Sequence, residues 1–208
     1  MKLISKYFPH LLLLAYIIEF SILAIKPYDR AVWFTENFTI IPIVVVLVIL
    51  YFCKVRFSNF AYALMSVLVF MHTYGGHYTF ALAPFDWFNH MFGFQRNMYD
   101  RVAHMTVGFY AYAMIEALIR YKVVNQKWFA YFASFMIIPA IAAFYEIFEW
   151  RYAVDSDPTA GLAVLGSQGD IWDAQEDMLM DTIGGAIGTI LYFVFGRTKS
   201  SVYFCKNS

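Results

Sequence analysis

The sequence predicts an all-α protein: a polytopic integral membrane bundle of about six transmembrane helices, forming one domain over residues 1–208. Two observations predict this class. The residues are 61% hydrophobic and only 14% charged, whereas a soluble domain carries about a quarter charged residues. The apolar residues also gather in segments near the length of about 20 residues that a helix needs to cross a bilayer core.

Six apolar segments approach this length, and polar connections separate them. The first is not a cleavable signal peptide, because Glu19 interrupts its apolar run and the later segments need an anchor. The third is interrupted near its end by Gly75 and Gly76. The expected segments are residues 8–26, 37–53, 60–80, 101–119, 128–150 and 176–196.

The basic residues predict the orientation of the chain. Ten of the fifteen Lys and Arg residues fall on the side that holds both termini. By the positive-inside rule, the N- and C-termini are then cytoplasmic. Cys53 and Cys205 also fall on this reducing side, so no disulfide framework is expected.

Two long outer loops are expected, over residues 81–100 and 151–175. The first is rich in Phe, Trp and Tyr, which favour the headgroup layer, so we expect it to lie on the outer leaflet. The second contains glycines and acids and is either a lid or a plain loop. The chain has no basic patch with interleaved aromatics and no phosphate-binding glycine loop, so we expect lipids rather than nucleic acid as partners.

The sixth segment opens with a run of acids, DIWDAQEDMLMDTIGG. Asp173, Asp177 and Asp181 are four residues apart, which places them on one face of a helix. Helix capping and the helix dipole account for acids in the first turn. They do not account for Asp181, two turns further in.

The fourth segment opens with YDRVAHMTVGF, in which Asp100 and His104 share a helical face. Asp100 could be a helix cap and His104 a hydrogen-bonded core residue. Buried together at the outer surface, they instead resemble an acid that orients an imidazole and raises its basicity.

The fifth segment closes with FYEIFEWRY, so Glu146 and Glu149 lie at the C-terminal end of a helix. The dipole disfavours acids at that end. Basic residues, a metal or bound protons must therefore stabilise them. The plain alternative is an Arg-carboxylate network that ties helix ends together.

The third segment contains MHTYGGHY, which places His72 and His77 near the same outer end. Five residues apart, the two side chains share no helical face unless Gly75 and Gly76 break the helix. Packing against neighbouring tyrosines is the simpler role for both.

Four helices thus deliver acids and imidazoles to one side of the membrane. An ionisable group within a span costs roughly 2.5 to 3.5 kcal/mol on insertion scales, so such groups normally face a bundle interior or a wet cavity. We expect a polar cavity open to the outside, with Gly184, Gly185 and Gly188 allowing close helix packing below it.

The same stretches carry a resemblance to a known family. HTYGGHYTFALAPFDW, RNMYDRVAHMTVGF, FYEIFEWRYA and GDIWDAQEDMLMDTIGGAIG resemble the YjdF family of uncharacterised bacterial inner-membrane proteins, over nearly the whole chain. A fainter likeness reaches the VanZ-like membrane proteins, whose pattern has Asn where Asp181 or Thr182 stands here. The resemblance implies a bacterial inner membrane and a multi-pass helical fold, and little about mechanism.

The leading hypothesis is an enzyme acting on a lipid or lipid-linked substrate at the outer leaflet, with His104 as general base and a divalent ion, Mg²⁺, Mn²⁺ or Zn²⁺. The candidate catalytic residues are Asp100, His104, Glu146 and Asp181. The candidate metal ligands are Glu149, Asp173 and Asp177.

Two other functions are compatible with the same residues. One is a proton- or cation-coupled transporter in which the acids change protonation. The other is a non-catalytic scaffold held by ion pairs. Residues expected to bind substrate or form structural pairs are Arg96, Arg101, Arg151, His72 and His77.

Overall fold

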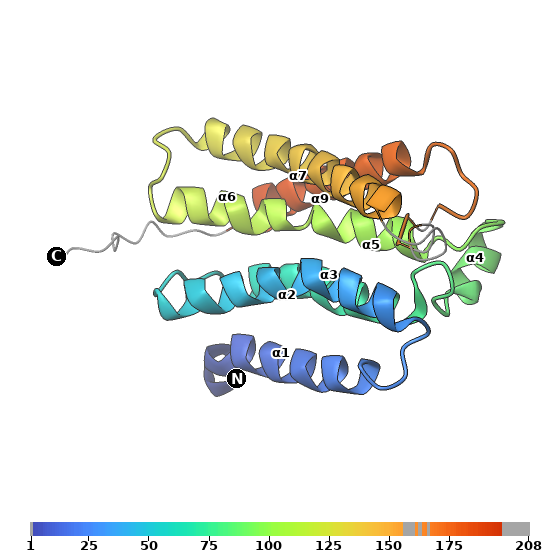
Figure 1. Ribbon diagram of the computed structural model, residues 1–208. Helices are drawn as coiled ribbons and strands as arrows, with labels where there is room; N and C mark the ends of the chain where they lie inside the picture. The colour runs from blue at the N-terminus through green and yellow to red at the C-terminus, as the bar shows by residue number, and fades with distance from the viewer. Residues whose placement is uncertain (1, 156–160, 162–163, 166, 197–208) are drawn as a thin grey trace.

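The computed structural model describes residues 2–155, 161, 164–165 and 167–196, and every regular element in this part of the chain is a helix. The long helices run side by side in one elongated bundle, and the short α4 lies at one of its ends (Figure 1). The predicted all-α class is confirmed. The helices are α1 (Lys2–Leu23), α2 (Arg30–Phe52), α3 (Asn59–Tyr78), α4 (Asp86–Phe92), α5 (Tyr99–Val107), α6 (Tyr110–Arg120), α7 (Lys127–Asp155) and α9 (Asp173–Phe195).

Two helices hold the bundle together. α9 packs against α5, α6 and α7, while α3 packs against α1, α2, α5 and α6. Many large apolar side chains lie on the outer surface of the bundle, for example Phe38, Phe144 and Phe193, each more than 70% exposed. Such a surface suits hydrocarbon as the surrounding solvent.

Five stretches of the described chain are long and apolar enough to cross a membrane. The stretch that begins at Tyr99 combines α5 and α6. α3 is not among the five, because its mean hydropathy is lower. A sixth span and the side on which the termini lie stay predictions. The five stretches are Ser5–Leu23, Arg30–Phe52, Tyr99–Arg120, Lys127–Asp155 and Asp173–Phe195.

The second helix begins earlier than the apolar pattern predicts. Asp29 Oδ1 caps α2 by accepting hydrogen bonds from the backbone N–H groups of Ala31 at 2.7 Å and Val32 at 3.0 Å. The helix therefore includes Glu36 and Asn37, and both side chains are buried. A carboxyl group that the sequence pattern leaves in a loop thus lies inside the protein.

The two glycines of the third segment do not break its helix, so His72 and His77 do not come to share one helical face. α3 runs through Gly75 and Gly76 to Tyr78 and ends where Thr79 takes the left-handed conformation, with φ of 61°. The glycines serve packing: a Cβ on Gly75 would lie 2.5 Å from the Phe80 ring, and one on Gly76 would lie 3.0 Å from Cβ of Glu36. α2 can therefore approach α3 closely at this level.

α5 and α9 are in backbone contact. A Cβ on Gly108 would overlap the backbone of Gly184 and Gly185, and a Cβ on Gly184 would overlap the carbonyl oxygen of Met105. Glycines let two helices approach this closely. The contact sets the relative register of α5 and α9, and therefore decides which polar side chains meet one turn away.

Candidate functional site: an arginine cluster beside a buried histidine

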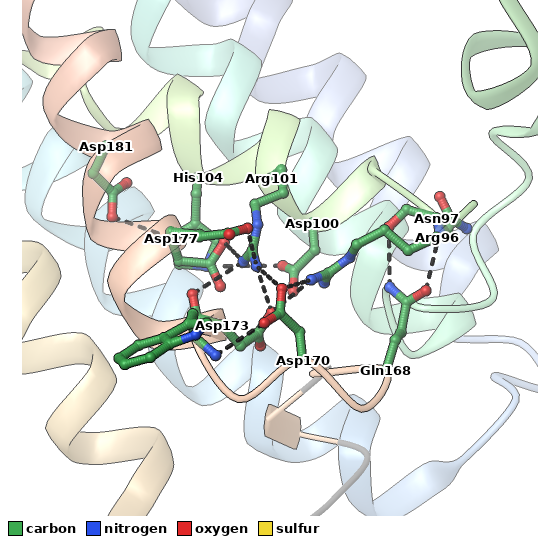
Figure 2. A network of polar contacts seen from close by, with 12 residues as sticks. Arg96, Asn97, Asp100, Arg101, His104, Gln168, Asp170, Asp173, Asp177 and Asp181 are labelled. Atoms are coloured by element: carbon green, nitrogen blue, oxygen red, sulfur yellow. Dashed lines mark hydrogen bonds and ion pairs between the residues drawn. The ribbon is translucent and has the colours of Figure 1, made fainter. Parts of the chain in front are cut away.

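Arg101 of α5 is almost completely buried and lies against the first two turns of α9. Its Nη1 lies 2.5 Å from Asp177 Oδ1, and its Nη2 lies 2.8 Å from Asp173 Oδ1. Figure 2 shows these side chains converging on the guanidinium group. We call the set the arginine cluster; its members are Arg96, Arg101, Asp170, Asp173, Glu176 and Asp177.

The arginine cluster carries more negative than positive charge. Arg96 Nη1 lies 3.1 Å from Asp170 Oδ2 and 3.0 Å from Asp173 Oδ1. Arg101 Nη2 also reaches Glu176 Oε2 at 3.1 Å. Two guanidinium groups therefore face four carboxylates, and the excess negative charge favours a nearby cation.

Hydrogen bonds between side chains and backbone groups fix the loops that carry the cluster. Gln168 Oε1 accepts from the Asn97 backbone N–H, and Gln168 Nε2 donates to the Asn97 carbonyl, both at 3.0 Å (Figure 2). Asp170 Oδ1 accepts from the Trp172 backbone N–H at 2.9 Å. This hydrogen bond lowers the pKa of the Asp170 carboxyl, and the charges of Arg101 and Arg96 lower it further.

His104 lies one turn before Gly108, facing α9. Its Nδ1 lies 3.1 Å from Asp181 Oδ2, and both side chains are buried. A neutral ring that donates its Nδ1–H to Asp181 carries its lone pair on Nε2. That Nε2 lies 3.8 Å from Asp100 Oδ1 and 3.9 Å from Asp177 Oδ1.

Three of these groups are spaced to share a metal ion. One ligand atom each from Asp100, His104 and Asp177 lie within 4.8 Å of one another, and all three residues are buried. Two ligand atoms bound to one ion at about 2.1 Å lie about 3 Å apart, so the widest pair of the trio must move together by up to about 1.8 Å to share an ion. One imidazole and two carboxylates suit Mg²⁺, Mn²⁺ or Zn²⁺.

A second observation points to a ligand at the same place. Asp181 Oδ1 is buried and has no hydrogen-bond partner among the described residues. A buried polar atom without a partner costs about 1 to 3 kcal/mol, more when charged. We call Asp100, His104, Asp177 and Asp181 the His104 site.

The His104 site borders a cavity of about 120 Å³ that α2, α3, α5, α7 and α9 enclose. In the described chain, no Lys or Arg nitrogen lies within 4 Å of the carboxylates of Glu36, Glu149 or Asp181. Imidazoles are the basic groups in the lining. Its ionisable and hydroxyl-bearing residues are Glu36, Thr39, His72, Asp100, His104, Tyr145, Glu149 and Asp181.

Sequence reasoning missed Glu36 as a member of this group. Its Oε2 lies 3.3 Å from His72 Nε2, and both residues are buried. The signal was present: Asp29 followed by a helical segment is a helix start, and a start there brings Glu36 one turn before the apolar run.

The remaining candidate residues lie in different surroundings. Glu149 lines the cavity, and Glu146 lies within electrostatic range of His104. Asp173, expected as a metal ligand, is paired with Arg96 and Arg101 in the arginine cluster.

Two candidates have partners elsewhere. His77 Nδ1 donates a hydrogen bond to the carbonyl oxygen of Leu23 at the end of α1, 2.6 Å away. Arg151 pairs with Asp155 on the exposed surface of α7. α7 thus occupies the start of the loop expected over residues 151–175, and residues 156–160, 162–163 and 166 of that loop lie outside the described part.

Comparisons with known proteins agree with the membrane character of the chain. The family described as predicted membrane protein (DUF2238) matches residues 8–198. The inner membrane protein YjdF of Escherichia coli (strain K12) is 30% identical over 174 residues, covering 81% of this chain and 80% of that protein. No solved structure matches.

Proposed function

The chain belongs to the DUF2238 family of predicted membrane proteins. We propose, from the geometry of the His104 site, that it is a divalent-cation-dependent enzyme acting on a lipid or lipid-linked substrate at the outer leaflet. We place it in a bacterial inner membrane, like its relative YjdF of Escherichia coli. α3, with 20 residues, is the sixth span in this proposal. Both termini are then cytoplasmic, as the basic residues favour.

One observation carries the proposal: Asp181 holds Nδ1 of His104 at 3.1 Å, so that Nε2 faces Asp100 and Asp177. Metal-binding histidines usually donate their second N–H to a carboxylate or carbonyl in this way. The geometry favours His104 as a ligand over His104 as the general base. Asp181 is then the residue that orients the ring.

The positions of Glu149 and Glu146 indicate their roles in the proposed reaction. Glu149 lines the cavity across from the His104 site and has no basic nitrogen within 4 Å among the described residues. It is our candidate for the general base, with Glu146 one turn earlier on α7. A bound divalent ion would supply Lewis acidity toward a phosphoryl or acyl oxygen.

The shape of the cavity supports an amphipathic substrate. The cavity lining changes from polar to apolar with depth. On α2 it changes from Glu36 to Ile43, and on α5 from Asp100 to Val107. Ile141 of α7 continues the apolar wall. A polar headgroup would meet the His104 site while a hydrocarbon chain contacts the deeper wall.

Exposed aromatic and aliphatic residues near the site also suit a lipid substrate. α4 exposes Trp87, Met91 and Phe92, and the start of α9 follows the exposed Ile171 and Trp172. Figure 1 shows α4 at the same end of the bundle as the start of α9, which carries the acids of the arginine cluster. Aromatic side chains of this kind favour the headgroup layer.

Metal content and metal-dependent thermal shift of detergent-purified protein test the proposal. We expect about one divalent ion per chain in the wild type and its loss in Asp177→Asn and His104→Ala. Glu176→Gln is the matched control, because Glu176 is on the same helix and pairs with Arg101 but lies outside the His104 site. A wild type that binds none of Mg²⁺, Mn²⁺ and Zn²⁺ would exclude the proposal.

Proton- or cation-coupled transport is the second candidate. It is favoured by the absence of basic partners for Glu146 and Glu149 within 4 Å in the described chain. A pathway also needs polar groups toward the other end, and Glu116 there is held by Arg120 at 2.5 Å and by Ser58 at 2.6 Å. Proton uptake by reconstituted vesicles, without metal binding, would favour transport over catalysis.

A further inference from the structure

A second cavity lies at the opposite half of the bundle from the His104 site. α1 and α2 both pack against α3 and leave a groove of about 140 Å³ between them. The lining is almost entirely apolar, with Leu13 and Tyr16 on one side and Val44 and Val48 on the other. Such a groove on a membrane-exposed face is complementary to hydrocarbon.

The length of the groove matches part of one leaflet. Along α1 it extends from Pro9 to Tyr16, and along α2 from Val44 to Phe52. At about 1.5 Å per residue these stretches span roughly 10 to 12 Å. Half of a bilayer core is about 15 Å thick, so the groove covers most of the acyl region of one leaflet.

The polar end of the groove is basic. The Arg56 guanidinium carbon lies 3.4 Å from the centre of the Tyr51 ring, and Tyr51 lines the groove. Nη1 of Arg56 is buried without a hydrogen-bond partner, and no carboxylate lies within 4 Å of the Arg56 guanidinium group in the described chain. Arg56 as a whole is half-buried, and its stacking on Tyr51 leaves the positive charge without a carboxylate, so an anion at this end of the groove would be stabilised.

Other basic groups surround the same end. His10 lines the groove and packs edge-on against Tyr51, with ring centroids 5.0 Å apart. Lys6 precedes it by one turn, and Lys54 follows the end of α2; both are exposed. A positive mouth thus opens onto an apolar channel.

We propose that this groove binds an anionic phospholipid, with its phosphate at Arg56 and one acyl chain between α1 and α2. The charge of the mouth selects an anionic headgroup, and the depth of the apolar groove selects a ligand with an acyl chain over free phosphate. The site uses none of the residues of the His104 site. It stands whether or not the protein binds a metal.

Native mass spectrometry of the detergent-purified full chain tests the proposal, with phosphatidylglycerol or phosphatidylcholine added at equal concentration. We expect phosphatidylglycerol to bind more tightly to the wild type. Arg56→Gln should weaken its binding about fivefold, because one basic residue near a headgroup contributes about 1 kcal/mol. Lys127→Gln removes the same charge at the same end, away from the groove, and should change nothing.

A filled groove gives the second test. Leu13→Trp places a larger side chain in the channel and should reduce binding of both lipids while leaving Arg56 in place. Equal binding of the two lipids by the wild type would overturn the proposal. So would Arg56→Gln behaving like Lys127→Gln. If Arg56→Gln does not fold, the wild-type preference and Leu13→Trp still decide, because neither depends on that variant.

Discussion

Arg101 Nη1 and Asp177 Oδ1 lie 2.5 Å apart, and each side chain is only 2% exposed. This contact joins α5 to α9 inside the membrane-facing bundle. Desolvating two charges is costly, and the cost is recovered only when each charge keeps its partners. Asp173 supplies a further contact to the same guanidinium group, both from its carboxylate and from its backbone carbonyl.

Replacing Arg101 should therefore be strongly destabilising. We expect Arg101→Gln to lower the free energy of unfolding of the metal-free protein by about 3 to 5 kcal/mol, because Asp177 would keep a buried charge without its cation. Denaturant unfolding in detergent measures the loss. Arg96→Gln is the control: its side chain is 19% exposed, and we expect a loss of about 1 kcal/mol. Equal losses in the two variants would contradict the assignment of Arg101 as the centre of the cluster.

The glycine contact between α5 and α9 gives an independent prediction. Gly108→Ala should destabilise the protein by about 1 to 3 kcal/mol or more, because the new methyl group meets the backbone of Gly184 and Gly185, which cannot move aside. Thermal unfolding in detergent is the measurement. Gly185→Ala is the matched control, since its Cβ would lie 3.3 Å from a side chain, that of Ile138. A control as damaging as Gly108→Ala would show that the effect is not specific to the backbone contact.

The fold class could be predicted from the sequence because the hydrophobic segments dominate the composition. Helix ends could not be read as well, since they depend on single capping groups. Asp29 moves the start of α2 to Arg30, seven residues before the predicted segment at residue 37. Because of that shift, the apolar pattern does not place Glu36 in the candidate site.

The site could be predicted only in part, because the spacing of residues gives the face of a helix but not its contacts. The four-residue spacing of Asp173, Asp177 and Asp181 placed them on one face of α9. Their different partners depend on depth along α5: Asp173 meets Arg101, whereas Asp181 meets His104 one turn further in. Periodicity gives the face of a helix and not the register between two helices, which here is set by Gly108.

The pH dependence of stability should include Asp170, which precedes α9. Its pKa in the folded protein is below the ordinary value, chiefly because it accepts the Trp172 N–H. A depressed folded pKa adds stability at pH values above the unfolded pKa of about 3.9, and this stability is lost as the pH falls through the folded pKa. The melting temperatures of wild type and Asp170→Asn should therefore differ at neutral pH and converge below about pH 4. A difference that persists in acid would show that lost packing, and not charge, explains the variant.

Asp181 distinguishes the two roles open to His104. If His104 is a metal ligand, Asp181→Asn should weaken metal affinity about 10- to 100-fold, because the Asp181 carboxylate orients the imidazole through Nδ1 and raises its basicity. Calorimetric titration of the metal-free protein with Mn²⁺ measures this affinity. Asp177→Asn removes one of the three closely spaced donors and should have the larger effect. If His104 were the general base, Asp181→Asn would leave Mn²⁺ affinity unchanged and reduce turnover alone, so an unaltered titration would return His104 to the catalytic role.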